Sequence, residues 1–276
     1  MTGPAVHLHT VFTHAPRPAL AGQVAIVIDQ LRASTTIATA LAHGASSIFP
    51  TLTPAAAITA KRRSDRATPA SSPCILGGER GGILIDGFDL GNSPREYTAA
   101  AVGGRTLAFT TTNGTAALQH AAGAQFVLVG CLANAAAIVK AAYRAAAFNT
   151  NTHQKRRAPL AIHLLCAGTR RTVTLEDCLV AGLMASRLAK LGCDLDGGVK
   201  LPDGDDTARL CALLAERVHA EHGWLAALKT SRGGRNCARV GLGSDVADCA
   251  KVDSLSVVPR YRSKTAKSPA RITLMP

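Results

Sequence analysis

The 276-residue chain carries a formal net charge of +13, and 47% of its residues are hydrophobic and 18% charged. This balance excludes a disordered or fibrous protein and supplies enough apolar surface for a large folded unit. The apolar runs are far shorter than the roughly 20 residues of a membrane-spanning helix, and the N-terminus lacks the basic-then-apolar pattern of a secretory signal. We therefore predict a cytoplasmic protein with no membrane partner.

The first half of the chain alternates short apolar runs with Ala-rich helical stretches, which is typical of βαβ units. Unbroken Val, Ile and Leu runs suit strands that are covered on both faces. We predict strands at 24–28, 47–49, 106–109, 126–129 and 160–165, and helices at 35–43, 115–122, 134–147, 174–191 and 207–221. The fold class is therefore α/β, with a layered, mostly parallel sheet flanked by helices.

A single unit of residues 1–276 is expected, divided into two unequal lobes (1–150 and 151–276) with a cleft between them. Residues 61–73 and 149–159 are polar or basic and contain proline, so we interpret them as insertions or linkers. A glycine-rich segment at Gly233 and Gly234 and an irregular C-terminus complete the predicted chain.

The basic residues are concentrated in 61–66, 155–157 and 260–271, with few aromatic side chains among them to stack on bases. We interpret these runs as solvated loops and do not expect nucleic acid as a partner. The eight cysteines are scattered without a Cys-x-x-Cys pair, which favours reduced, buried thiols over a zinc site. A field of positive sign also favours encounter with a small anionic substrate.

Asp29 ends the first predicted strand, and the next helix begins with Arg32, Thr35 and Thr36. A carboxylate at a strand end can hold a divalent cation, and a helix N-terminus offers free N–H groups to a phosphate. Arg32 adds a planar fork that matches phosphate oxygens. The alternative is that Asp29 caps the helix and pairs with Arg32.

Residues 76–94 read LGGERGGILIDGFDLGNSP, and this density of glycine permits a concave backbone site for an anion. Glu79 and Arg80 stand between glycine pairs, where they would serve as metal ligand or base and as phosphate clamp. Gly81, Asn92 and Ser93 add backbone and side-chain donors for substrate. A glycine-rich surface loop with incidental charges remains the alternative.

Thr111, Thr112, Asn113 and Gly114 occupy another turn from strand to helix. Hydroxyls and an amide beside free helix N–H groups make a neutral cradle for phosphate, sulfonate or carboxylate. Simple N-capping is the alternative, because any of these side chains can perform it.

Asp177 follows Thr174 at capping-box spacing, so a purely structural role stands beside a role as metal ligand. Cys166 ends the last predicted strand and could act as a nucleophile if positive charge lowered its pKa, although packing is the simpler interpretation. Known phosphatase loops are absent: Thr172 stands where a protein-tyrosine phosphatase needs arginine after its cysteine, and Leu31 stands where a haloacid dehalogenase needs a second aspartate.

Five segments, VAIVIDQLRASTTIATAL, LGGERGGILIDGFDLGNSP, TTTNGT, CAGT and TLEDCLVAG, occur in this order and together resemble the 2-phosphosulfolactate phosphatase family. The resemblance covers roughly residues 24–191 and continues loosely through 241–259. It implies a magnesium-dependent hydrolase that converts 2-phosphosulfolactate to sulfolactate and phosphate, a step of coenzyme M biosynthesis in methanogens. A homodimer is left open. The chain departs from the family pattern at Gln30, Arg170 and Arg171.

With the resemblance in view, we hypothesise that Asp29, Glu79 and Asp177 hold Mg²⁺ and that Arg32 and Arg80 stabilise the phosphoryl oxygens. The alternatives are a phosphatase for another 2-phospho-2-hydroxy acid and a non-catalytic binding protein for a small phosphorylated acid.

Overall fold

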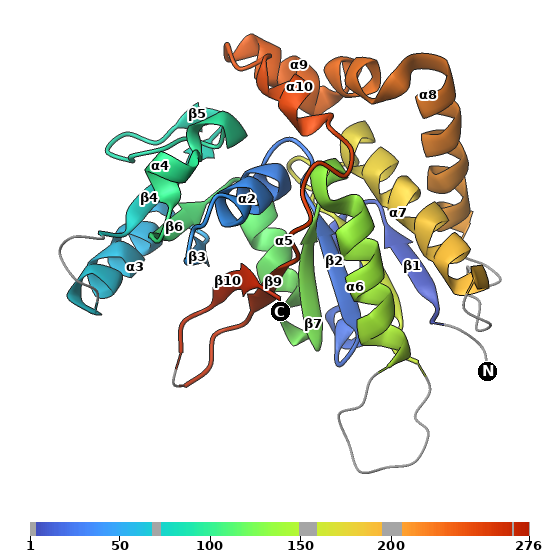
Figure 1. The fold of residues 1–276 in the computed structure, drawn as a ribbon, viewed down its shortest axis with the longest axis horizontal. Coiled ribbons are helices and arrows are strands. Elements are labelled where there is room, and N and C mark those ends of the chain that lie inside the picture. Colours follow the sequence, from blue (N-terminus) through green and yellow to red (C-terminus); the bar gives the residue numbers. More distant parts are fainter. Residues whose placement is uncertain (1–3, 68–72, 149–158, 195–205, 267, 276) are drawn as a thin grey trace.

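The computed structural model describes residues 4–67, 73–148, 159–194, 206–266 and 268–275 (Figure 1). Within these residues the strands form one sheet in the order β1–β8–β2–β7–β9–β10–β3–β6–β4–β5. The strands are β1 (Val6–His9), β2 (Val24–Ile28), β3 (Ser47–Thr51), β4 (Ile75–Arg80), β5 (Ile83–Leu84), β6 (Thr106–Thr110), β7 (Phe126–Gly130), β8 (Ile162–Cys166), β9 (Pro259–Arg262) and β10 (Arg271–Leu274). The helices are α1 (Arg17–Leu20), α2 (Ala33–Ala42), α3 (Pro54–Ala67), α4 (Ala99–Val102), α5 (Gly114–His120), α6 (Ala135–Ala147), α7 (Leu175–Asp194), α8 (Asp206–Thr230), α9 (Arg232–Arg239) and α10 (Asp245–Cys249).

Two parallel portions make up most of the sheet. Strands β1, β8, β2 and β7 pair in parallel, and so do β3, β6 and β4. The β9–β10 hairpin joins the two portions through antiparallel pairs with β7 and β3. The predicted α/β class with a mostly parallel, helix-flanked sheet is therefore confirmed.

Helices α2 and α5 lie between the two parallel portions, while α6, α7 and α8 cover the outer face of the first portion (Figure 1). The burial of strand β2 on both faces explains why its apolar run is unbroken. Val24, Ile26 and Ile28 belong to the core under α6 and α7, and Ala25 and Val27 belong to the core around α2 and α5. A strand buried on both faces has no solvent-facing positions, so alternation disappears.

Each predicted strand and helix is present, with its bounds shifted by a few residues or, for α8, extended to Thr230. Other predictions were wrong. Residues 61–67 belong to helix α3 rather than to a linker, and Gly233 and Gly234 lie inside α9. The predicted linker at 149–159 falls almost entirely outside the described residues.

The C-terminus is not irregular, because β9 and β10 cross the middle of the sheet. In each strand a buried apolar residue, Tyr261 or Ile272, stands between more exposed neighbours. This alternation is concealed in the sequence by the surrounding basic residues. Arg260 is not fully solvated either, because its guanidinium stacks on the ring of Phe126.

Residues 76–94, where only a loop was predicted, contribute most of strand β4 to the sheet. Gly78 has φ of +140°, and a Cβ atom there would lie 2.0 Å from the backbone oxygen of Thr110. Glycine is therefore required for the close approach of β4 to β6. The same pairing brings the end of β4, with Glu79 and Arg80, beside the end of β6.

Gly182 lets α7 and α8 pack with their backbones in contact. A Cβ atom at this position would lie 2.0 Å from the carbonyl oxygen of Cys211. We expect Gly182→Ala to lower the free energy of unfolding by about 1–3 kcal/mol, because two backbones must separate. Chemical denaturation measures the effect. Gly123→Ala, at an exposed site with no atom within 4 Å, is the control, and an equal loss in both variants would contradict the packing argument.

None of the described helices is long and apolar enough to cross a lipid bilayer. The sheet draws strands from both sides of residue 150, since β8 pairs with β1 and β2. The division into two lobes stays a prediction.

Candidate functional site

The ends of β2, β4 and β6 meet beneath helix α9 and enclose a cavity of about 500 Å³. Predicted site residues that line it are Asp29, Arg32, Glu79, Arg80, Gly81, Asn92, Thr112 and Asn113. The remaining wall comes from Leu31, Gly82, Thr169, Arg170, Arg232, Gly233, Arg235, Asn236, Cys237 and Arg239. Segments that are far apart in the sequence are thus brought into one polar pocket.

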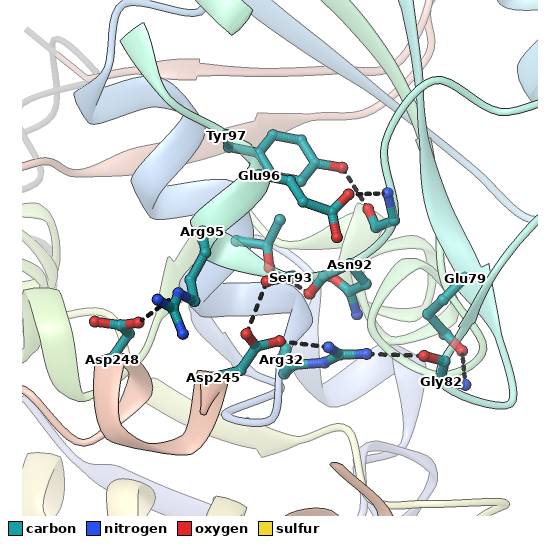
Figure 2. Close-up of polar contacts among 12 residues, drawn as sticks. Arg32, Glu79, Gly82, Asn92, Ser93, Arg95, Glu96, Tyr97, Asp245 and Asp248 are labelled. Atoms are coloured by element: carbon teal, nitrogen blue, oxygen red, sulfur yellow. Dashed lines mark hydrogen bonds and ion pairs between the residues drawn. The ribbon is translucent and has the colours of Figure 1, made fainter. Parts of the chain in front are cut away.

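The carboxylate of Glu79 connects two walls of the cavity. Its Oε1 accepts hydrogen bonds from the backbone N–H of Thr112 (2.7 Å) and from the Thr112 hydroxyl (2.9 Å). Its Oε2 accepts from the backbone N–H of Gly82 (2.7 Å), at the turn into β5 (Figure 2). Glu79 is therefore held in a fixed position, with both oxygens engaged.

Arg80 is similarly fixed by three acceptors. It donates to the carbonyl of Glu79 (2.6 Å), to the carbonyl of Leu52 (2.9 Å) and to the hydroxyl of Thr110 (2.9 Å). The side chain brings a positive charge to the cavity wall, and its orientation is determined by the protein itself.

Arg32 lies between Asp245 and the turn at Gly82 (Figure 2). Its Nη1 contacts Asp245 Oδ2 at 2.5 Å, and its Nη2 donates to the Gly82 carbonyl at 3.0 Å. The other oxygen of Asp245 accepts from the Ser93 hydroxyl at 2.8 Å. The alternative in which Arg32 pairs with Asp29 is therefore wrong, and α10 supplies a partner that the sequence did not indicate.

Asp29 is a buried carboxylate on the cavity wall. It is buried at the end of β2, and it accepts hydrogen bonds from the N–H groups of Ala33 (3.3 Å) and Gly114, where α2 and α5 begin. Burial, followed by repulsion from Glu79, raises its pKa from 3.8 to about 7, and Glu176 adds to the effect. The carboxylates of Asp29, Glu79 and Glu176 are thus close enough to repel one another.

Asp177 does not line the cavity. Its Oδ1 accepts from the N–H of Gln30 (2.8 Å), and its Oδ2 accepts from the N–H of Gly168 (2.9 Å) and the hydroxyl of Thr174 (3.0 Å). It therefore links the ends of β2 and β8 to the start of α7. Burial, with repulsion from Asp29, raises its pKa well above the ordinary value.

Glu176, which precedes Asp177 in the sequence, has one carboxylate oxygen without a hydrogen-bond partner among the described residues. Its Oε1 accepts from the N–H of Gly233 (2.9 Å), while its buried Oε2 has no hydrogen-bond partner among the described residues. Burial raises the pKa of this carboxyl as well. Asn92 Oδ1, on the cavity wall, is the second buried acceptor that the described residues leave without a partner.

Several residues that were predicted to contact the substrate lie behind the cavity wall and do not line the cavity. The hydroxyl of Thr36 donates to the carbonyl of Asn92 (2.9 Å), and that of Thr35 donates to the carbonyl of Gln30 (3.2 Å). Thr111 accepts from the N–H of Thr115 (3.3 Å) at the start of α5. Together with Ser93 and Gly114, these residues support the cavity from outside its lining.

Comparison with known proteins identifies the family of the chain. A sequence model of the 2-phosphosulpholactate phosphatase family matches residues 11–264. The chain belongs to the 2-phosphosulfolactate phosphatase family. A protein of Symbiobacterium thermophilum named "Probable 2-phosphosulfolactate phosphatase" is 38% identical over 249 residues, or 89% of this chain and 94% of the relative. A protein of the same name from Deinococcus radiodurans is 39% identical over 237 residues, or 86% of each chain. All five segments on which the resemblance rested fall inside the matched range.

The sequence analysis did not identify helix α9 as part of the cavity wall. Arg232, Arg235 and Arg239 follow one another at i, i+3 and i+7, which places them on one face of a helix. The segment was interpreted only through Gly233 and Gly234, so this periodicity went unused.

Cys166 is fully buried, and it neighbours Cys178. A hydrogen bond with Cys178 lowers the pKa of the Cys166 thiol. Burial and nearby carboxylates raise this pKa by more, so the net shift is upward. A buried thiol with a raised pKa is a poor nucleophile, so the packing interpretation is favoured. Over the part of the chain that the structure describes, no group of three or more His, Cys, Asp or Glu side chains is arranged to hold a metal ion.

Proposed function

We propose that the chain is a phosphatase that hydrolyses 2-phosphosulfolactate, or a similar 2-phospho-2-hydroxy acid, to the hydroxy acid and phosphate with the help of Mg²⁺. The observation that carries this proposal is the cavity itself, in which carboxylates, amides and six arginines meet at the ends of three strands. Such a pocket combines carboxylates, which could hold a cation, with positive charge for phosphoryl oxygens, and phosphate-ester hydrolysis draws on both.

A magnesium site here would use few protein ligands, because no group of three or more acidic, His or Cys side chains gathers in the described residues. Mg²⁺ binds through one or two carboxylates and substrate phosphate rather than through a complete protein cage. Asp29 would hold it, because this carboxylate is buried on the cavity wall, and its burial together with repulsion from Glu79 and Glu176 raises its pKa. The unpartnered Oδ1 of Asn92, on the cavity wall, would be a further oxygen ligand. Glu79 and Asp177 have both oxygens engaged by protein donors, so they position the other ligands.

A bound Mg²⁺ would supply charge that neutralises phosphoryl oxygens. The chain's own groups then determine the geometry. Arg80 and Arg32 are held rigidly by acceptors of the protein, so their charges are already in place before substrate arrives. The amide of Asn113 lies on the same wall, where its Oδ1 accepts from the N–H of Arg170 (3.2 Å) and leaves the NH₂ group for the ligand.

Phosphate release from a panel of esters, measured with and without a chelator, tests the proposal. We expect release from 2-phosphosulfolactate that disappears when Mg²⁺ is removed and returns when it is added back. Tight substrate binding without release in the presence of Mg²⁺ would identify a non-catalytic binding protein instead. Release that a chelator leaves unchanged would remove magnesium from the proposal. The cytoplasmic location and the homodimer stay predictions.

A further inference from the structure

A second cavity, of about 850 Å³, shares no described lining residue with the candidate active site. Helices α3 and α5, strand β3 and the β9–β10 hairpin form most of its walls. Its lining is mainly apolar, with contributions from Phe49, Pro50, Leu52 and Pro269. A cavity of this size and character is typical of a site for a small organic ligand.

The cavity lies where the two parallel portions of the sheet are joined by few contacts. Strand β3 pairs with β6 over five residue pairs, but with β10 only through Ile48 and Ile272. Beyond Ile48, residues 49–51 of β3 line the cavity instead of pairing with β10. The opening is therefore a consequence of the sheet topology.

Both charged side chains among the described lining residues are basic. Arg63 comes from α3, and Lys264 comes from the segment between β9 and β10. The fold thus brings together the two basic runs at 61–66 and 260–271, which are distant in the sequence. Neither side chain forms an ion pair with a described acidic residue, since the acid of α3, Asp65, pairs with Lys61. Uncompensated positive charge beside an apolar wall favours an anion.

Tyr261 adds a hydrogen-bond donor to the cavity wall. Only 6% of this residue is exposed, and its hydroxyl has no hydrogen-bond partner among the described residues. The oxygen is not sealed by protein atoms either, so it is open to a ligand. Burial raises the pKa of the phenol, which therefore stays protonated at neutral pH and can donate.

We propose that this cavity is a second ligand site, for a small molecule with an apolar body and one acidic head group. The body displaces water from the apolar wall. Arg63 and Lys264 attract the head group, and the Tyr261 hydroxyl donates to an acceptor of the ligand. Fatty acids and aromatic carboxylates share this chemistry. The site does not depend on the phosphatase function, because the two cavities share no described lining residue.

Calorimetric titration with three eight-carbon probes tests the ligand class. Octanoate, octan-1-ol and octyltrimethylammonium carry the same chain with a negative, a neutral and a positive head group. We expect one octanoate to bind per chain, at least about tenfold more tightly than octan-1-ol, because two cations attract its head group. Octyltrimethylammonium should bind more weakly than either. Titration with 2-naphthoate then distinguishes an aromatic body from an aliphatic one.

Variants of the lining locate the site. Arg63→Gln and Lys264→Gln should each raise the Kd of octanoate about threefold and leave that of octan-1-ol unchanged. Tyr261→Phe should raise the Kd of octanoate about fivefold, because it removes one hydrogen bond. Ala56→Trp fills the cavity from an exposed position of α3 and should abolish binding of both probes. Arg62→Gln, which removes the same charge from the neighbouring position outside the lining, is the matched control.

Thermal unfolding without ligand checks that each variant is folded. Absence of octanoate binding would overturn the site, and equal affinities for octanoate and octan-1-ol would overturn its anionic class. Equal weakening by Arg62→Gln and Arg63→Gln would overturn it as well, because attraction would then come from the net charge of the chain. Unchanged octanoate binding by Ala56→Trp would place the ligand elsewhere.

Discussion

Asp29→Asn is expected to reduce phosphate release by at least about 10³-fold and, in metal-free protein at pH 8, to raise the free energy of unfolding. The loss of activity follows because Asp29 is the cavity carboxylate proposed to hold Mg²⁺, and a metal contributes several kcal/mol to charge stabilisation. The gain in stability follows from its environment. Burial and Glu79 raise the pKa of Asp29 to about 7, so the ionised form destabilises the folded protein.

The pH dependence of this stability has a definite sign. Between about pH 4 and pH 7 the folded protein binds more protons at Asp29 than the unfolded chain, so the contribution of this group to stability falls as pH rises. Well above pH 7 the full penalty applies, on the order of 4 kcal/mol. Asp29→Asn should therefore stabilise the protein at pH 8 and have little effect at pH 4.

Thermal unfolding in chelator at these two pH values measures the effect, and phosphate release is assayed with Mg²⁺. Asp86→Asn, which alters an acid outside the cavity lining, is the control. Unchanged turnover in Asp29→Asn would remove this residue from the active site. A variant that is equally destabilised at both pH values would show that the hydrogen bonds of Asp29 outweigh its charge.

Asp245→Ala is expected to lower the free energy of unfolding by about 3–5 kcal/mol, because it leaves the guanidinium of Arg32 buried and unpaired. Only 3% of the Arg32 side chain and 1% of the Asp245 side chain are exposed. The hydroxyl of Ser93 loses its acceptor as well. Urea denaturation of the metal-free protein measures the change.

Two further variants keep this prediction falsifiable. Glu221→Gln breaks the exposed pair with Arg217 and should cost less than about 1 kcal/mol. Replacing both buried partners, as Arg32→Met with Asp245→Leu, should recover most of the stability while phosphate release stays low, since Arg32 lines the cavity. A loss for Asp245→Ala as small as that for Glu221→Gln would contradict a desolvated ion pair.

Local sequence signals found most of the elements on which the site is built. The run at 24–28 predicted β2, and the polar residues after it correctly marked Asp29 and Arg32 as cavity residues. The signal failed at β4, where glycines were read as a loop, because close packing against β6 requires glycine and glycine carries no strand pattern. It failed again at β9 and β10, whose strand character depends on two residues packing into a core formed mainly by distant segments.

The sequence by itself determined the α/β class, the strand ends that carry Asp29 and Thr112, and the family. Only the tertiary structure decided which charged groups meet. Asp245 pairs with Arg32, and Asp177 links the ends of two strands by hydrogen bonds. Helix α9 brings its arginines to the cavity wall. The reason is physical. Hydrophobic periodicity is a property of neighbouring residues, whereas the pairing of charges depends on distances between residues that are, for Arg32 and Asp245, 213 positions apart.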